Sequence, residues 1–242
     1  MATRLASDTG AQSSLYRFSA CFIEPRQTLY LLLVTFQSLI SMQIQAFTVG
    51  VLSTNYYVVS CPETREAIII DPGFGASYEG EQIIRYVDAG TLKVKFIVNT
   101  HGHFDHINGD VVLKRKYVVP VCIHRYDAQS LNDLGGDIPP DNVLLEDGEV
   151  VKFGQVMLKV MHTPGHTPGG ISFVGEKIVF TGDTLFAGGI GRTDFEGGSD
   201  RDMRRSLKKL LGLPNNYSVY PGHGFVSTIG EEKRVNPFLR WL

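Results

Sequence analysis

A dense group of metal-binding side chains lies near the middle of the sequence. The segment THGHFDH places His101, His103, Asp105 and His106 within six residues, although the whole chain of 242 residues has only seven histidines. Two histidines two positions apart point to the same side of an extended chain. Neutral imidazoles together with a carboxylate suit zinc, iron or manganese. The spacing therefore predicts a metal site rather than ordinary polar residues at the start of a helix.

Three later segments each present a further ligand in a turn or at the end of an apolar run. The segment HTPGHTPGG contains two histidines. His166 is the better candidate ligand, and His162 is expected to hydrogen-bond loop backbone or to support a ligand. An apolar run ending in Gly-Asp-Thr presents Asp183, whose two oxygens could bridge two metal ions, and YPGHG presents His223 in a glycine loop.

A fifth segment, GRTDF, places an arginine and an acid in a glycine-rich loop. The simpler interpretation is that Arg192 pairs with Asp194 and braces this loop. The alternative is that Arg192 also contacts an anionic group of a substrate. His124 lies outside all five segments and is predicted to be structural.

The segments that position these side chains are mostly short and rich in β-branched and aromatic residues, as strands are. Expected strands span 44–49, 56–60, 67–70, 94–98, 119–123, 150–153, 157–161, 171–174, 178–181 and 218–220. Expected helices span 79–87, 105–117, from a capping-box-like Ser199 to 211, and 231–239. Helices fall between groups of strands, which predicts an α+β fold in which two mainly antiparallel sheets pack together with helices outside.

Composition excludes several classes of protein. Lys and Arg total 23 against 25 Asp and Glu, so no basic surplus is available to bind nucleic acid by bulk charge. No apolar run reaches the ~18 residues that a membrane span needs. Cys21, Cys61 and Cys122 form no CxxC pair, which argues against a disulfide framework or a cysteine zinc site. A reducing compartment, the cytoplasm, is the simplest expectation.

Residues 1–41 differ from the rest, because they are rich in Ser and Thr and end in an apolar stretch. Three interpretations stay open for this extension. It is an upstream start ahead of a natural initiator at Met42, a targeting peptide that would direct the protein to an organelle, or an ordered appendage. Residues 42–242 are predicted to form one domain.

In their order along the chain, these segments resemble the ligand signature of the metallo-β-lactamase superfamily, and the resemblance covers residues 42–242. It implies a four-layer αββα sandwich with a metal site at one edge of the two sheets. It also implies two divalent metal ions, with zinc expected first and iron or manganese as alternatives. The ligands implied for the first ion are His101, His103 and His166, those for the second are Asp105, His106 and His223, and Asp183 bridges the two.

The segments HTPGH, GDTLF, GRTDF and NPFL are similar to those of the glyoxalase II-like group, the hydroxyacylglutathione hydrolases and their single-domain relatives. Asp183 stands where the commonest zinc β-lactamases have cysteine, so the resemblance does not favour a β-lactamase. Glyoxalase II has a C-terminal helical region that grips glutathione, whereas 19 residues follow His223 here. The single-domain relatives are therefore the expected match, and the leaving thiol stays open.

The function implied is hydrolysis of a small-molecule thioester by a binuclear metal enzyme. Two dications that share a water lower its pKa, and the hydroxide formed would attack the thioester carbonyl. Asp105 is expected to orient this hydroxide and Asp183 to hold both ions, which makes them the catalytic residues. A thiolate needs little acid assistance to leave, because thiol pKa values lie near 8.5.

The strongest alternative is a persulfide dioxygenase. Such enzymes share the fold and the GRTDF loop, and they use one iron, here on His101, His166 and Asp183 by resemblance. A site of this type leaves positions open for oxygen and a sulfur substrate. Ester or lactone hydrolases and a non-catalytic metal-binding protein are further alternatives. The YPGHG and NPFL segments favour the thioester hydrolase.

Overall fold

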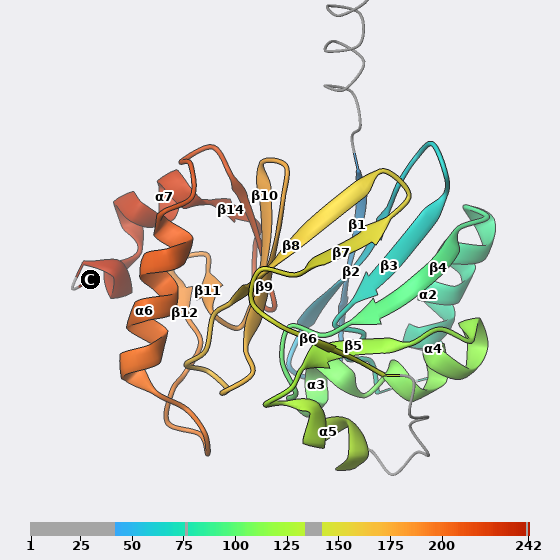
Figure 1. Ribbon diagram of the computed structural model, residues 1–242, viewed down its shortest axis with the longest axis horizontal. Coiled ribbons are helices and arrows are strands. Elements are labelled where there is room, and N and C mark those ends of the chain that lie inside the picture. Colours follow the sequence, from blue (N-terminus) through green and yellow to red (C-terminus); the bar gives the residue numbers. More distant parts are fainter. Residues whose placement is uncertain (1–41, 76, 134–141, 241) are drawn as a thin grey trace, which may run out of the picture. The chain divides into compact units, whose positions relative to one another are not determined.

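The computed structural model describes residues 42–75, 77–133, 142–240 and 242. In this part of the chain two six-stranded sheets face each other, and a two-stranded sheet lies beside them (Figure 1). The first sheet contains β1 (Gln43–Val49), β2 (Thr54–Ser60), β3 (Glu66–Ile70), β4 (Lys93–Val98), β5 (Val121–His124) and β6 (Val143–Leu145), in this order. The second contains β14 (Ser227–Thr228), β13 (Ser218–Pro221), β10 (Ile178–Gly182), β9 (Ile171–Gly175), β8 (Val156–His162) and β7 (Val150–Phe153). The small sheet pairs β11 (Leu185–Phe186) with β12 (Gly189–Ile190).

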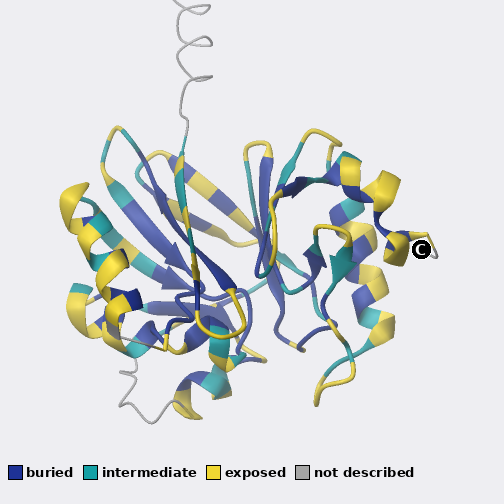
Figure 2. Cartoon of the chain, turned by 180° about the vertical axis from the view of Figure 1, so that it is seen from behind, coloured by how far each residue is buried: buried dark blue, intermediate teal, exposed yellow. Residues whose placement is uncertain are grey.

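Helices cover the outer face of each large sheet (Figure 1). Those of the first half are α2 (Ser77–Ala89), α3 (Phe104–Ile107), α4 (Asp110–Tyr117) and α5 (Ala128–Asp133). Those of the second half are α6 (Asp200–Leu211), α7 (Ile229–Val235) and the 3₁₀ helix η1 (Pro237–Leu239). Figure 2 shows buried residues concentrated on the strands and exposed residues on the outward faces of the helices. None of the helices in the described ranges has the length and hydropathy that a membrane crossing requires.

The strand β2 shows why these sequences form a layered structure. All seven of its residues are buried, and successive side chains point to opposite faces of a strand. Tyr57 and Val59 face the space between the two sheets, whereas Tyr56 and Val58 face the helices. A strand buried on both faces reads as a continuous apolar run, which is the pattern seen here.

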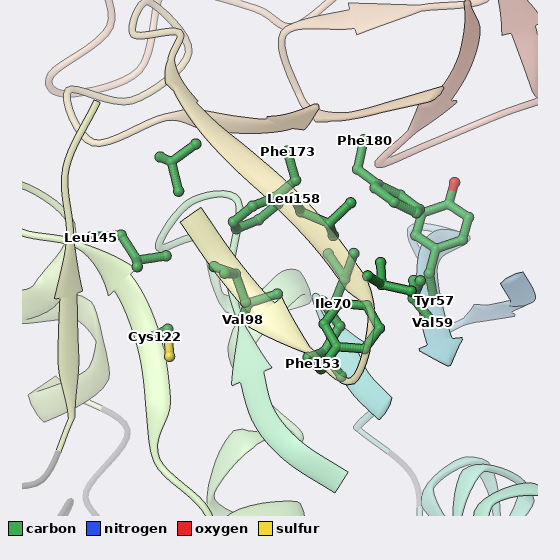
Figure 3. Close-up of a cluster of buried hydrophobic side chains, with 14 of the residues drawn as sticks. Tyr57, Val59, Ile70, Val98, Cys122, Leu145, Phe153, Leu158, Phe173 and Phe180 are labelled. Carbon is green, nitrogen blue, oxygen red and sulfur yellow. The ribbon is translucent and has the colours of Figure 1, made fainter. Parts of the chain in front are cut away.

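Three apolar clusters fill the spaces between the layers. The first lies between the two sheets, where Ile70 and Val98 of one sheet meet Phe153, Leu158 and Phe173 of the other (Figure 3). The second packs the first sheet against α2 and α4, and the third packs the second sheet against α6 and α7. The predicted four-layer αββα sandwich is therefore confirmed.

The expectation of two mainly antiparallel sheets is wrong for the first sheet. Its strands β3, β4, β5 and β6 pair in parallel, and only β1–β2–β3 is antiparallel. Parallel neighbours need crossover connections, and α2 together with the α3–α4 segment supplies them. The second sheet is mainly antiparallel, with one parallel pair between β10 and β13.

Two expected helices are interrupted. The helix expected over 105–117 divides into α3 and α4 at Asn108–Gly109. A side chain at Gly109 would collide with the carbonyl oxygen of Pro72, so the chain changes direction there. The helix expected over 231–239 ends at Asn236, because Pro237 lacks the N–H that a continuing helix needs.

Several short elements were not predicted, namely α5, β6, β11, β12 and β14. The cap at Ser199 was, and its hydroxyl accepts a hydrogen bond of 3.2 Å from the Asp202 N–H. The prediction for residues 1–41 lies outside the described residues. The domain boundary, the nature of that extension and a cytoplasmic location therefore stay predictions.

Candidate metal centre

The seven proposed ligands come from loops that follow four strands. β4 leads into His101, β8 into His166, β10 into Asp183, and β13 into His223. The neighbours β10 and β13 are parallel, so their carboxyl ends meet at one edge of the second sheet, where the Gly222 N–H donates to the Gly182 carbonyl at 2.9 Å. The two sheets are joined at this edge by a 2.8 Å hydrogen bond from the Ile171 N–H to the Thr100 carbonyl.

The structure brings all seven side chains into one cluster. Its first group, with ligand atoms within 4.8 Å of one another, is His101, His103 and His166. A second group meeting the same limit is Asp105, His106 and His223. These are the two sets that the family resemblance implied, reached here from coordinates alone.

Asp183 lies between the two groups. Its Oδ2 is 3.3 Å from Nε2 of His166 and 3.4 Å from Nε2 of His223. Its Oδ1 is 3.4 Å from Nε2 of His106. One carboxylate therefore faces histidines of both groups, which is the position that a bridging ligand would need.

The outer ring nitrogens of four histidines are fixed by acceptors, so their inner nitrogens face the cluster. The carbonyl oxygens of Arg192 and Leu52 only accept hydrogen bonds, so Nδ1 of His166 and His223 must donate to them, at 2.7 and 3.1 Å. His106 Nδ1 donates in the same way to Asp71 at 3.1 Å. In each ring Nε2 is left with its lone pair directed inward, as metal ligation requires.

Asp71 supports two ligands at once. Its Oδ2 accepts hydrogen bonds from His106 Nδ1 and from the Thr100 hydroxyl, the latter at 2.6 Å. Because that hydroxyl donates to Asp71, it accepts from His101 Nδ1, which lies 3.1 Å away. Asp71 is 2% exposed and has a backbone φ of 52°, an unusual conformation for a residue other than glycine. Sequence analysis treated the Asp-Pro-Gly stretch as a turn signal only and missed this role.

Asp127 was missed as well. Its Oδ2 accepts hydrogen bonds from the Gly102 N–H at 2.9 Å and the Thr167 hydroxyl at 2.6 Å, and its Oδ1 accepts from the Gly169 N–H at 2.6 Å. These donors belong to the two loops that carry the first group of histidines. An acid shortly after a buried strand was the available signal, but nothing in the sequence showed what it would contact.

Two buried atoms show that the cluster suits cations. Nε2 of His101 and Oδ1 of Asp183 have no hydrogen-bond partner among the described residues. Buried polar atoms are seldom left unsatisfied. Five imidazoles and two carboxylates converging on the same space fit divalent transition metals, because such ions bind nitrogen and oxygen lone pairs together.

The electrostatics of the protein groups agree with this fit. Burial, together with the neighbouring imidazole of His106, holds the pKa of His101 well below its ordinary value, which keeps that ring neutral. Burial opposes ionisation of Asp183, but the imidazoles of His106, His223 and His166 outweigh it and lower the pKa of its carboxyl. The pKa of Asp105 is lowered too, against burial, chiefly by hydrogen bonding to His223 and by His106. A neutral imidazole and ionised carboxylates are the forms that bind metals.

Glycine is required where the backbone passes the cluster. A Cβ at Gly222 would overlap Oδ1 of Asp183 and lie 2.8 Å from Cε1 of His106. At Gly182, φ is +48° and a Cβ would overlap the Thr100 side chain. The glycines of GDT and PGH thus allow the second sheet to approach the histidines of the first.

The remaining candidate residues lie apart from the cluster. Arg192 donates from Nε and Nη2 to the two oxygens of Asp194, both at 2.6 Å. Nε2 of His162 lies 3.0 Å from the Pro168 carbonyl oxygen, and its ring stacks on that of His124, with centroids 4.3 Å apart. His124 and His162 are in none of the ligand groups found among the described residues.

A pocket of about 730 Å³ opens onto the cluster. Five of the proposed ligands line it, namely His103, Asp105, His166, Asp183 and His223. Arg192 and several apolar side chains form the rest of its wall. The ligand cluster is therefore accessible to a small molecule.

Curated relatives of this chain carry different names. An uncharacterized protein of Mycobacterium tuberculosis is 39% identical over 225 residues, which cover 83% of this chain and 99% of the relative. Hydroxyacylglutathione hydrolase GloC of Haemophilus influenzae is 37% identical over 192 residues, covering 73% and 89%. The human mitochondrial persulfide dioxygenase ETHE1 is 35% identical over 190 residues, covering 76% and 70%.

Solved structures show the same spread. The B3 metallo-beta-lactamase BLEG-1 is 33% identical with a TM-score of 0.71, covering 82% of this chain and all of that one. ETHE1 from Myxococcus xanthus is also 33% identical with a TM-score of 0.71, covering 81% and 84%. A protein crystallised in a di-iron-bound form is 36% identical with a TM-score of 0.68, covering 81% and 100%.

The family is shown by a further match. The sequence model of the metallo-beta-lactamase superfamily matches residues 49–223, a range that contains every proposed ligand. The fold, the order of the ligand segments and this match agree, and the chain belongs to the metallo-beta-lactamase superfamily.

Proposed function

We propose that the protein is a hydrolase of small-molecule thioesters that holds two divalent metal ions. The observation that carries the proposal is the completeness of the second group. Asp105, His106 and His223 converge as closely as the three histidines of the first group, and Asp183 faces both. A mononuclear site would need no such second set, whereas two ions flanking one reacting centre are typical of hydrolases.

His101, His103 and His166 would hold the first ion, Asp105, His106 and His223 the second, and Asp183 both. When bound, the ions supply a hydroxide at neutral pH and polarise the substrate carbonyl. Zinc is the first expectation, and iron and manganese suit the same donors.

The residues of this chain prepare the site for that chemistry. Thr54 donates a hydrogen bond of 2.8 Å to Oδ2 of Asp105, and His223 Nε2 lies 3.4 Å from the same oxygen. Asp105 is therefore held with one oxygen toward the cluster, where it would accept a proton of an attacking water. Phe195 and Phe186 lie edge-on to His103 and His223, with centroids 5.5 and 5.9 Å apart, and they shield the ligands from bulk water. A thiolate leaving group needs no acid from the protein.

A mononuclear iron persulfide dioxygenase is the second candidate. The identities to GloC and to ETHE1 are similar, at 37% and 35%, so relatedness does not separate the two activities. This alternative needs only His101, His166 and Asp183 as ligands, and it makes no use of Asp105 or His223.

One variant separates the candidates. His223→Ala removes a ligand of the second group and leaves the three residues of the iron alternative in place. The hydrolase proposal predicts that purified wild type cleaves a thioester under anaerobic conditions, and that His223→Ala loses at least about a hundredfold in kcat/KM together with about one bound ion. Oxygen uptake with a persulfide that persists in His223→Ala, without thioester cleavage by wild type, would establish the dioxygenase instead.

A further inference from the structure

The pocket wall beyond the proposed ligands is apolar. Five apolar side chains line it, namely Leu52, Phe104, Phe186, Ile190 and Phe195. Leu52, Phe104 and Phe195 are 50%, 59% and 44% exposed, which is high for large apolar side chains. Apolar side chains gathered around a concave site are typical of a surface that a ligand covers. The wall therefore favours an apolar group beside the reacting centre.

The charged groups at the rim do not favour an anion. Among the described residues, Arg192 is the one Lys or Arg side chain that lines this pocket. Its Nε and Nη2 both donate to Asp194, and its guanidinium carbon lies 4.0 Å from the ring centre of Phe195. One donor edge and one face of the guanidinium are thus occupied by groups of this chain. Glu196 lines the same pocket and adds a second carboxylate to the rim.

We propose that the pocket selects thioesters with an apolar acyl group and an uncharged thiol, and that Asp194 excludes anionic thioesters by occupying Arg192. The inference rests on the proposed thioester hydrolysis and names its substrate class. Glutathione carries more carboxylates than ammonium groups, and binding a carboxylate calls for a free arginine edge or a lysine. A carboxylate at this rim would meet Asp194 and Glu196, and like charges brought together weaken binding.

The first part of the test compares substrates that differ in one half only. Wild-type protein with its metal is assayed at low ionic strength, because salt screens exposed charges. We expect the hexanoyl thioester of N-acetylcysteamine to exceed the hexanoyl thioester of glutathione by about tenfold in kcat/KM. Lengthening the acyl group should raise kcat/KM by about threefold per methylene buried in the pocket.

The second part tests Asp194 with a matched control. Asp194→Asn should raise kcat/KM for the glutathione thioester by about three- to tenfold through KM, and leave the neutral thioester within about twofold. Asp202→Asn removes the same charge from an exposed Arg–Asp pair on α6, where Asp202 lies 3.5 Å from Arg205, and it should change neither value. Equal losses for both thioesters in Asp194→Asn would show that Asp194 only braces its loop, and would overturn the proposal.

A binding measurement separates this inference from the proposed function. S-hexylglutathione and the S-hexyl thioether of N-acetylcysteamine are not hydrolysed, so calorimetry reports the pocket preference alone. Tighter binding of the neutral thioether by a protein that cleaves no thioester would refute the proposed function and leave the preference standing. Tighter binding of S-hexylglutathione would overturn the preference, even in an active thioester hydrolase.

Discussion

Asp127 Oδ2 accepts a hydrogen bond of 2.9 Å from the backbone N–H of Gly102. Gly102 lies between two of the proposed ligands, so this bond fixes the loop that presents them. The same carboxylate reaches the second histidine loop through Thr167 and Gly169. A single buried acid on the β5–α5 connection therefore sets the separation of the histidines in the first group.

Replacing Asp127 should weaken metal binding without removing any proposed ligand. Asp127→Ala leaves the N–H groups of Gly102 and Gly169 without their acceptor, and changes of this kind cost about 10- to 100-fold in metal affinity. Competition against a chromogenic chelator measures the loss. Asp133→Asn, an exposed acid at the end of α5, is the control and should bind metal as wild type does. Wild-type affinity in Asp127→Ala would show that the loops are fixed by other contacts.

The hydroxyl of Thr54 should matter for the second group. Thr54→Val keeps the shape of the side chain but removes the 2.8 Å hydrogen bond to Asp105. We expect kcat/KM to fall about tenfold, with little change in KM, because the carboxylate loses its orientation rather than its charge. Thr54→Ser restores the donor and should recover most of the activity. Equal activity of the Val and Ser variants would count against this role.

Removal of metal should destabilise the fold as well as abolish activity. Without cations, the buried Nε2 of His101 and Oδ1 of Asp183 have no partner among the described residues. An ion present at about 1,000 times its Kd contributes about 4 kcal/mol, which corresponds to roughly 10 °C in Tm for a chain of this size. Calorimetry before and after dialysis against a chelator, with zinc added back, measures this shift. An unchanged Tm would mean that no ion is bound by the folded state.

Asp110 should make stability depend on pH. It is 1% exposed, and burial raises the pKa of its carboxyl well above the ordinary value. For a carboxyl whose pKa is raised on folding, the stabilisation is complete below the unfolded-state pKa near 3.9 and is lost as pH rises through the folded-state pKa. Asp110→Asn removes this loss, and its amide can donate to the unpartnered Oδ1 of Asn99.

The variant should therefore exceed wild type in Tm at pH 8 by about 2–4 °C, the shift for about 1 kcal/mol, and by less at pH 4.5. Both proteins are compared metal-free, so that ligand protonation does not dominate the curves. Asp88→Asn, which alters an exposed pair with Lys116, is the control and should follow wild type at both pH values. A Tm gap that is equal at the two pH values would contradict the role of Asp110.

The ligand cluster was predictable because its members are marked by local sequence. Each proposed ligand follows an apolar strand and sits beside glycine or another ligand, so residue type and spacing identify it without knowledge of the fold. The supporting acids were not predictable in this way. Asp71 and Asp127 contact the histidine loops across 29 and 25 residues of chain, and those contacts exist only once the strands have assembled.

Sheet topology escaped the sequence for a related reason. The apolar runs of β3, β4 and β5 identify buried strands, but a run buried on both faces does not show the direction of its neighbour. The interruption between α3 and α4 depends on Gly109 passing close to the Pro72 carbonyl, a contact between separate segments. The short strands β11, β12 and β14 span only two residues each, too few for any periodicity.

The metal content of the purified protein tests the central claim most directly. Plasma mass spectrometry of protein isolated without added metal gives both the identity and the stoichiometry of the bound ions. The binuclear hydrolase predicts about two ions per chain, rich in zinc, falling to about one in His223→Ala. About one iron per chain, unchanged in His223→Ala, would contradict the account and assign the site to the dioxygenase.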